Sequence, residues 1–228
     1  MAQNFLLKLN IFVRYFHKSH SLEPLNEFLV PKLNHGIDLI RLGPDGDGGY
    51  LIPSDLSKIG FCVSPGVGPS SLFELELEES YGIPSLLLDG SVQSPPQILQ
   101  KGIFLQKYVS NFDDRTNIDL ISAISFAKKE FNSSKDGLLQ IDIEGNEFHC
   151  LVNRVVEISK SIQIIVMEVH FLDFVVFEHL NNALIALFRE ILTEYSLVNV
   201  AHNKCCGYMK MKGLKIPRVI ELTYVRNS

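Results

Sequence analysis

The sequence predicts an α/β fold with one mostly parallel central sheet and helices on both of its faces. Its 228 residues are enough for one α/β domain with a sizeable core but few for two. From about residue 61 onward, short apolar segments of strand length alternate with longer segments of helical periodicity. Residues 162–167 are apolar at nearly every position, which is typical of a parallel strand covered on both faces. We therefore expect one main domain at 38–228, preceded by a helical extension at 1–37.

The order of the expected elements follows from hydrophobic periodicity and from turn residues. A glycine-rich turn joins two short strands into a β-hairpin at 38–52, before the alternating region begins. Alternation of this kind implies right-handed crossovers, which bring ligands to the carboxyl ends of the strands. The expected strands are 38–42, 50–52, 61–63, 85–88, 104–109, 138–141, 162–167, 197–201 and 219–225, and the expected helices are 4–16, 70–81, 95–101, 117–131, 147–159 and 174–195.

Charge and cysteine content exclude some classes of protein. The net charge of −5 provides no basic field for gripping many phosphates, so we do not expect nucleic acid as a partner. The four cysteines form no CxxC pair, and vicinal Cys205 and Cys206 can hardly bridge each other without strain. We interpret them as reduced thiols of a cytoplasmic protein.

Residues 4–16 form an amphipathic segment with eight large apolar side chains. The segment is too short and too charged to cross a bilayer, and no small-residue cleavage site follows it. We expect this helix to pack on the body or on a second copy of the chain, giving a homo-oligomer, rather than on a membrane.

A glycine-rich loop at 64–71 follows the strand at 61–63. Gly66 and Gly68 would let the backbone approach a ligand closely, next to the free N–H groups of a helix N-terminus. Asp89 ends the next strand, where an acidic side chain can accept both ribose hydroxyls of a nucleoside. A nicotinamide dinucleotide is less well supported, because Ser71 occupies the third glycine position of the G-x-G-x-x-G pattern.

Four ionisable residues follow two neighbouring strands. Asp142 and Glu144 come after the strand at 138–141, and Glu168 and His170 end the strand at 162–167. Residues two apart in an extended chain share a side, so the four groups should meet at one edge of the sheet. Such a cluster supplies a general base or the ligands of a metal ion.

At this point the sequence resembles the FkbM-type family of methyltransferases that use S-adenosylmethionine (SAM), over roughly residues 38–226. The I-D-x-E-G-x-E block at 141–147 is the most specific of the matching motifs and the glycine loop the least. The matching pieces are Gly46-Asp47-Gly48-Gly49-Tyr50, Ser64-Pro65-Gly66-Val67-Gly68, Phe73-Glu74, Leu88-Asp89-Gly90-Ser91, Ile141 to Glu147, Met167-Glu168-Val169-His170, His202-Asn203, Pro217 and Glu221-Leu222-Thr223.

The resemblance implies a Rossmann-like class I methyltransferase fold, with SAM over the glycine loop and its ribose on Asp89. The loop has Ser64-Pro65 where many methyltransferases carry an acidic residue, so we expect Glu74 to replace that contact. The implied reaction is O-methylation of a small or saccharide hydroxyl, with N- or C-methylation and a non-catalytic nucleotide-binding or scaffold module as alternatives. The residues expected to contact SAM are Tyr50, Ser64, Gly66, Val67, Gly68, Glu74, Asp89, Gly90, Ser91 and Asp142.

A hydroxyl acceptor must lose a proton during methyl transfer, and two arrangements could assist. His170 or His202 could act as a base without metal. Alternatively, Asp142, Glu168, His170 and His202 could hold Mn²⁺ or Mg²⁺, which would lower the pKa of the acceptor hydroxyl.

Overall fold

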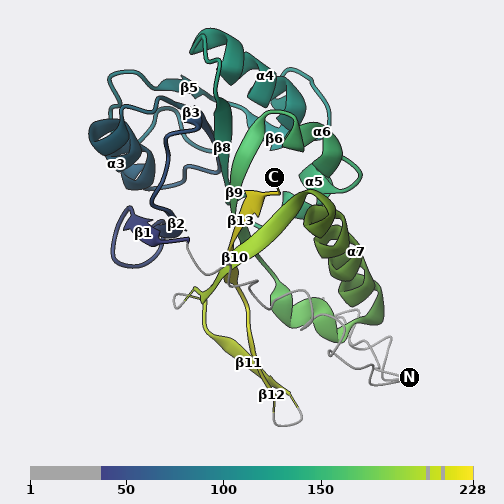
Figure 1. Cartoon of the computed structure of the whole chain (residues 1–228). Helices are drawn as coiled ribbons and strands as arrows, with labels where there is room; N and C mark the ends of the chain where they lie inside the picture. Colours follow the sequence, from purple (N-terminus) through teal and green to yellow (C-terminus); the bar gives the residue numbers. More distant parts are fainter. Residues whose placement is uncertain (1–36, 204–205, 212–213, 228) are drawn as a thin grey trace.

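The structure is a computed structural model that describes residues 37–203, 206–211 and 214–227. Its centre is a seven-stranded sheet in the order β10-β13-β9-β8-β3-β4-β5, drawn in Figure 1. Four neighbouring pairs, from β9 to β5, are parallel, and β13 is antiparallel to both of its neighbours. The strands are β3 (Ile59–Pro65), β4 (Ser85–Leu88), β5 (Ile103–Leu105), β8 (Asp136–Ile141), β9 (Ile162–Val169), β10 (Tyr195–His202) and β13 (Ile220–Arg226).

Each face of this sheet has its own hydrophobic core. Along β3, Phe61 and Val63 belong to one core and Cys62 to the other, because successive side chains of a strand point to opposite faces. The larger core includes α4 (Leu120–Glu130), α6 (Val155–Ser159) and α7 (Glu178–Glu194). The smaller includes α3 (Leu72–Tyr81) and the β1–β2 hairpin. Helices therefore cover both faces (Figure 1), and the α/β prediction is confirmed.

The predicted N-terminal β-hairpin is present. Strands β1 (Leu39–Leu42) and β2 (Tyr50–Pro53) pair antiparallel. Arg41 holds the connecting loop together, donating from Nε to the carbonyl of Pro44 at 3.1 Å and from its terminal nitrogen to that of Gly46 at 2.7 Å. Thr223 on β13 donates to the Leu51 carbonyl at 2.6 Å. This bond fixes the hairpin against the sheet, close to the carboxyl end of β9.

The prediction of one strand over 104–109 is wrong, because the chain turns after β5. The N–H of Lys107 donates back to the carbonyl of Leu105 at 2.8 Å. A new strand, β6 (Tyr108–Ser110), then pairs in parallel with β7 (Asn117–Asp119). The helix expected at 117–131 therefore starts later, where the Asp119 carboxylate accepts hydrogen bonds from the N–H groups of Ile121 and Ser122 and caps α4.

Two other helix predictions need correction. Residues 95–101 form no helix, because the N–H groups of Gln100 and Lys101 donate to the carboxylate of Glu78 on α3, at 2.8 and 2.9 Å. The helix expected at 147–159 is broken into α5 (Glu147–Leu151) and α6 by Asn153, whose φ is +61°. The Glu190 carboxylate accepts from the N–H of Asn153 and that of Val155, which stabilises the break.

The C-terminal half contains elements that periodicity did not predict. The helix expected at 174–195 begins as a 3₁₀ helix, η1 (Leu172–Val176), before α7. Strands β11 (Tyr208–Met211) and β12 (Leu214–Pro217) form an unpredicted hairpin that projects from the sheet (Figure 1). No helix among the described residues is long and apolar enough to cross a membrane. The helix expected at 4–16 and the oligomer expected from it lie outside the described residues.

Candidate functional site

The glycine loop follows β3 and passes directly against the end of β8. Gly66 has a φ of +85°, and its N–H donates to the Leu88 carbonyl at 2.8 Å. A Cβ added to Gly66 would lie 1.6 Å from the carbonyl oxygen of Asp142, so no other residue fits here. At Gly68, whose φ is +56°, an added Cβ would meet no protein atom within 4 Å. The loop is thus packed on one side and open on the other.

Asp89, at the end of β4, is a carboxylate surrounded by donors. It accepts from the Gly68 N–H at 2.9 Å, from the Ser91 N–H at 2.7 Å and from the Ser91 hydroxyl at 2.6 Å. Burial acts to raise the pKa of Asp89, but these hydrogen bonds outweigh it and lower the pKa. Asp89 is therefore a fixed anion that also ties the glycine loop to β4.

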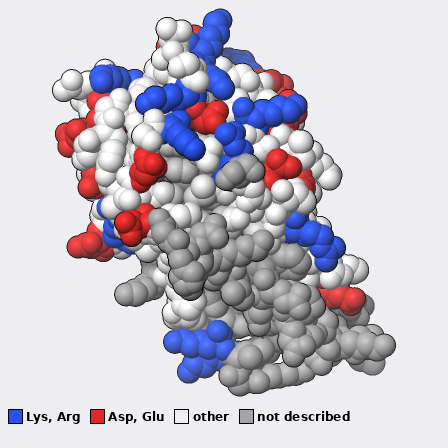
Figure 2. Space-filling view, viewed as in Figure 1, with Lys and Arg blue, Asp and Glu red and all other residues white. Residues whose placement is uncertain are grey.

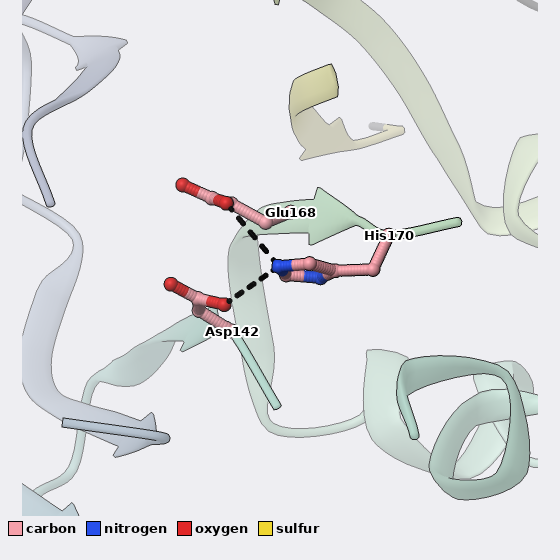
Figure 3. Close-up of side chains that lie close together, drawn as sticks. All are labelled: Asp142, Glu168 and His170. Atoms are coloured by element: carbon pink, nitrogen blue, oxygen red, sulfur yellow. Dashed lines mark ion pairs between the residues drawn. The ribbon is translucent and has the colours of Figure 1, made fainter. Parts of the chain in front are cut away.

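Three ionisable side chains converge where β8 and β9 end. Figure 3 shows Asp142, Glu168 and His170 pointing toward one another. The His170 Nε2 lies 3.5 Å from an Asp142 oxygen and 3.6 Å from a Glu168 oxygen. Among the described residues, these three offer one ligand atom each within 4.8 Å of one another. We call them the acid–histidine group.

Burial and mutual repulsion give this group unusual ionisation. Burial, followed by the charges of Glu147 and Glu144, raises the pKa of Asp142 to about 7, against the opposing effect of His170. Burial and Asp142 raise the pKa of Glu168 to about 8. Burial acts to lower the pKa of His170, but the hydrogen bond and charge of Glu147, with the other carboxylates, raise it to about 9. The carboxyls can thus change protonation near neutral pH, whereas His170 is a cation there.

Glu147 and Asn203 form hydrogen bonds to members of the acid–histidine group, although we had not predicted either as a site residue. Glu147 Oε1 lies 3.2 Å from the His170 Nδ1 and accepts from the N–H groups of Ile143 and Gly145 at 3.0 and 3.3 Å. It therefore orients both the histidine ring and the loop that carries Asp142. Their positions in the motifs at 141–147 and 202–203 were the only signals available.

Asn203 joins the β1–β2 loop to this group. Its amide donates to Glu168 Oε1 at 3.1 Å and to Asp47 Oδ1 at 2.8 Å. Asn203 is buried, and it is adjacent in sequence to the predicted site residue His202. His202 itself is exposed, and its ring lies 6.1 Å from the ring of Tyr208 rather than in the group. Neighbouring residues of an extended chain point to opposite sides, so only one of the pair can face the site.

A chain of buried polar contacts connects the group to α3. Gln140 on β8 donates from Nε2 to the Tyr50 hydroxyl at 3.2 Å, and that hydroxyl lies 3.3 Å from Asp142 Oδ2 and 3.4 Å from Glu168 Oε1. Tyr50 is buried, and its ring packs edge-on against that of Phe73.

At the other end of this chain, the Ser64 hydroxyl contacts both Gln140 Oε1, at 2.6 Å, and Glu74 Oε1. One hydroxyl has one hydrogen, so both contacts are hydrogen bonds only when Glu74 is protonated. Burial raises the pKa of Glu74, although the Ser64 hydrogen bond opposes it. Both observations favour a protonated Glu74, and its expected contact with SAM stays a prediction.

One pocket of about 140 Å³ lies between the glycine loop and Asp142, the member of the acid–histidine group that lines it. Predicted site residues Tyr50, Gly66, Val67, Glu74 and Asp142 line it, together with Asp47, Gly48, Pro69, Ser70, Phe73, Gln140 and Glu144. Of the other predicted contacts, Asp89 and Ser91 lie beside the pocket rather than in its lining: Asp89 accepts from the N–H of Gly68 in the glycine loop and from the Ser91 hydroxyl. Gly90 lies beneath the ring of Tyr108, which would be 2.4 Å from a Cβ there.

The comparisons agree with this architecture. A search of curated proteins gave no significant match. The Methyltransferase FkbM domain matches residues 15–196, which include the glycine loop, Asp89 and the whole acid–histidine group. With most of its length matched, and with a glycine loop and Asp142 lining one pocket, this chain belongs to the FkbM family of methyltransferases.

Proposed function

We propose that this chain is a SAM-dependent O-methyltransferase with a Rossmann-like class I fold, acting on a hydroxyl of a carbohydrate or similar polyhydroxylated small molecule. The observation that carries the proposal is the pocket bounded by the glycine loop on one side and by Asp142 on the other. A methyl donor and a group that accepts the hydroxyl proton must lie side by side, and this pocket offers both surfaces.

The residues present fit SAM. Gly68 has open space where any other residue would project a side chain. Asp89 next to it is an anion with a lowered pKa, suited to accept hydrogen bonds from ribose hydroxyls. Several carboxyl groups and few cations surround the pocket, which suits a positively charged sulfonium. When bound, SAM supplies an electrophilic methyl group.

The chain itself must align the acceptor and remove its proton. In the absence of metal, Asp142 is better suited to this than His170, because its pKa is about 7 and it lines the pocket. His170 is charged at that pH and would stabilise the Asp142 carboxylate beside it. Glu147 fixes the histidine ring, and Tyr50 and Asn203 fix Glu168.

The same residues also fit a divalent cation. Asp142, Glu168 and His170 offer two oxygens and one nitrogen, a donor set that suits Mn²⁺ or Mg²⁺. Such an ion would lower the pKa of an acceptor hydroxyl. Chelation separates the two versions, since EDTA abolishes turnover only if the ion takes part.

The test is binding and turnover by the purified chain. We expect calorimetry to detect binding of S-adenosylhomocysteine. We also expect the chain to transfer label from methyl-labelled SAM to polyhydroxylated acceptors but not to matched amines. Absence of S-adenosylhomocysteine binding would contradict the proposal and favour the scaffold alternative. Transfer to amines alone would favour N-methylation.

A further inference from the structure

Positive charge is concentrated in one segment of this acidic protein. Residues 195–220 contain Lys204, Lys210, Lys212, Lys215 and Arg218 and no Asp or Glu. The rest of the chain has 16 basic residues against 26 acidic ones. Such segregation points to an interaction with an anion at this segment.

The β11–β12 hairpin concentrates part of this charge on one face. Lys210 and Lys215 are directly opposite each other in the ladder, an arrangement that destabilises an isolated two-stranded sheet. The Lys215 Nζ lies 3.9 Å from the centre of the Tyr208 ring, which shares the face of Lys210. Within the described part of the chain, neither lysine forms an ion pair with a carboxylate. In Figure 2, a basic group stands at the lower end of the molecule, where Figure 1 places the hairpin.

The opposite face of the hairpin is occupied. Ile216 is buried in the larger core, and Met209, its ladder partner, packs against that core. Lys210 and Lys215 are exposed. The core therefore anchors the hairpin and leaves its cationic face to solvent.

This cationic face lies at the same edge of the sheet as the candidate site. Both β9 and β10 run antiparallel to β13, so their carboxyl ends are at one edge, and the hairpin follows β10. At the end of β10, Asn203 donates to Glu168, while the adjacent His202 lies against Tyr208 on the hairpin. One short segment thus connects the acid–histidine group to the lysine pair.

We propose that the face formed by Tyr208, Lys210 and Lys215 binds anionic groups of an extended saccharide acceptor, such as uronate or sulfate groups. This inference rests on the proposed function. The hairpin projects from the sheet (Figure 1) and its strands are each about 13 Å long, so we expect an acceptor that reaches both the lysines and Asp142 to be longer than a monosaccharide. Anionic groups would also relieve the repulsion between the two lysines.

A membrane surface is less well supported as the partner. Peripheral membrane binding combines basic charge with apolar side chains that insert into the bilayer. Among the hairpin residues whose side chains the structure describes, none is an exposed large hydrophobic residue.

The test compares anionic and neutral oligosaccharides of equal length on the full chain. We expect an oligogalacturonate or a heparin oligosaccharide to bind, with affinity that falls as salt rises, and a malto-oligosaccharide to bind at least tenfold more weakly. The double variant Lys210→Gln, Lys215→Gln should lose about tenfold in affinity for the anionic probes. The control is Lys129→Gln, Lys135→Gln, which removes the same charge from exposed lysines near the start of β8 and should bind normally.

Equal binding by the double variant and the control would overturn the inference, as would equal binding of anionic and neutral probes. Hairpin-dependent binding only to vesicles containing phosphatidylserine would instead assign the face to a membrane. Affinity for S-adenosylhomocysteine, measured in each variant, should not change. If the parent chain does not bind S-adenosylhomocysteine, the proposed function fails rather than the hairpin inference.

Discussion

Asp89 and Asp142 both follow a parallel strand of the same sheet, yet their surroundings differ. Backbone and hydroxyl donors surround Asp89, and its pKa is lowered. At Asp142 burial, followed by the charges of nearby acids, raises the pKa to about 7. The comparison shows that the local supply of donors, rather than the residue type or the strand end, decides whether an aspartate is a fixed anion or a proton acceptor. We expect the two sides of the pocket to fail separately when mutated.

The largest effect is expected from Asp142→Asn. Removing the proton acceptor should lower turnover about 10²- to 10⁴-fold, and change S-adenosylhomocysteine affinity far less. Initial rates with labelled SAM and calorimetry measure the two quantities. Glu130→Gln is the control, because that carboxylate is exposed at the end of α4 and does not line the pocket. An Asp142→Asn variant with full turnover would exclude Asp142 from proton removal.

Gly66→Ala should destabilise the fold by about 3 kcal/mol or more. The new Cβ would meet the backbone of Asp142, which cannot move aside without disturbing β8. Gly68→Ala is the control, since its Cβ meets open space and only the left-handed conformation costs about 1–2 kcal/mol. Urea unfolding measures both values. Equal destabilisation by the two changes would contradict the one-sided packing of the loop.

Asp89→Ala should weaken S-adenosylhomocysteine binding about 10- to 100-fold, through loss of charge-assisted hydrogen bonds and of the tie to Gly68. The affinity of Asp89→Asn, which keeps one acceptor oxygen, should lie between those of Asp89→Ala and the parent. Turnover at saturating SAM should remain near that of the parent. Loss of turnover without loss of affinity would contradict separate roles for Asp89 in binding and Asp142 in proton removal.

The smallest effect concerns stability and pH. The pKa of Glu168 is about 8 in the folded chain, above its ordinary value, so the unfolded chain loses this proton first as pH rises. Glu168 therefore reduces stability progressively between about pH 4 and pH 8. Glu168→Gln should raise the Tm by about 2–4 °C at pH 8 in EDTA, and hardly at pH 4. A Tm difference that does not grow with pH would contradict the raised pKa.

The strand ends show where sequence reasoning succeeded. Strands β4, β8 and β9 are almost entirely buried, and the acidic residues at their ends, Asp89, Asp142 and Glu168, were expected at the site because parallel strands end at one edge. The structure brings Asp142, Glu168 and His170 together as expected. Local periodicity is sufficient for such residues, because each strand fixes the position of the residues at its carboxyl end.

Other features depend on contacts between segments far apart in the chain. Glu78 takes the N–H groups that a helix at 95–101 would need, and Glu190 stabilises the break at Asn153. These partners are more than 20 residues away in sequence, so no local pattern reveals them.

The sequence by itself determined the alternation of strands and helices, the glycine loop and the acidic strand ends, because these depend on local periodicity and backbone conformation. Only the tertiary structure decided that Asn203 rather than His202 faces the acid–histidine group, and that Glu147 orients His170. It also decided the ionisation of the acids, because burial and the approach of other charges set a pKa, and both arise only when distant segments pack together.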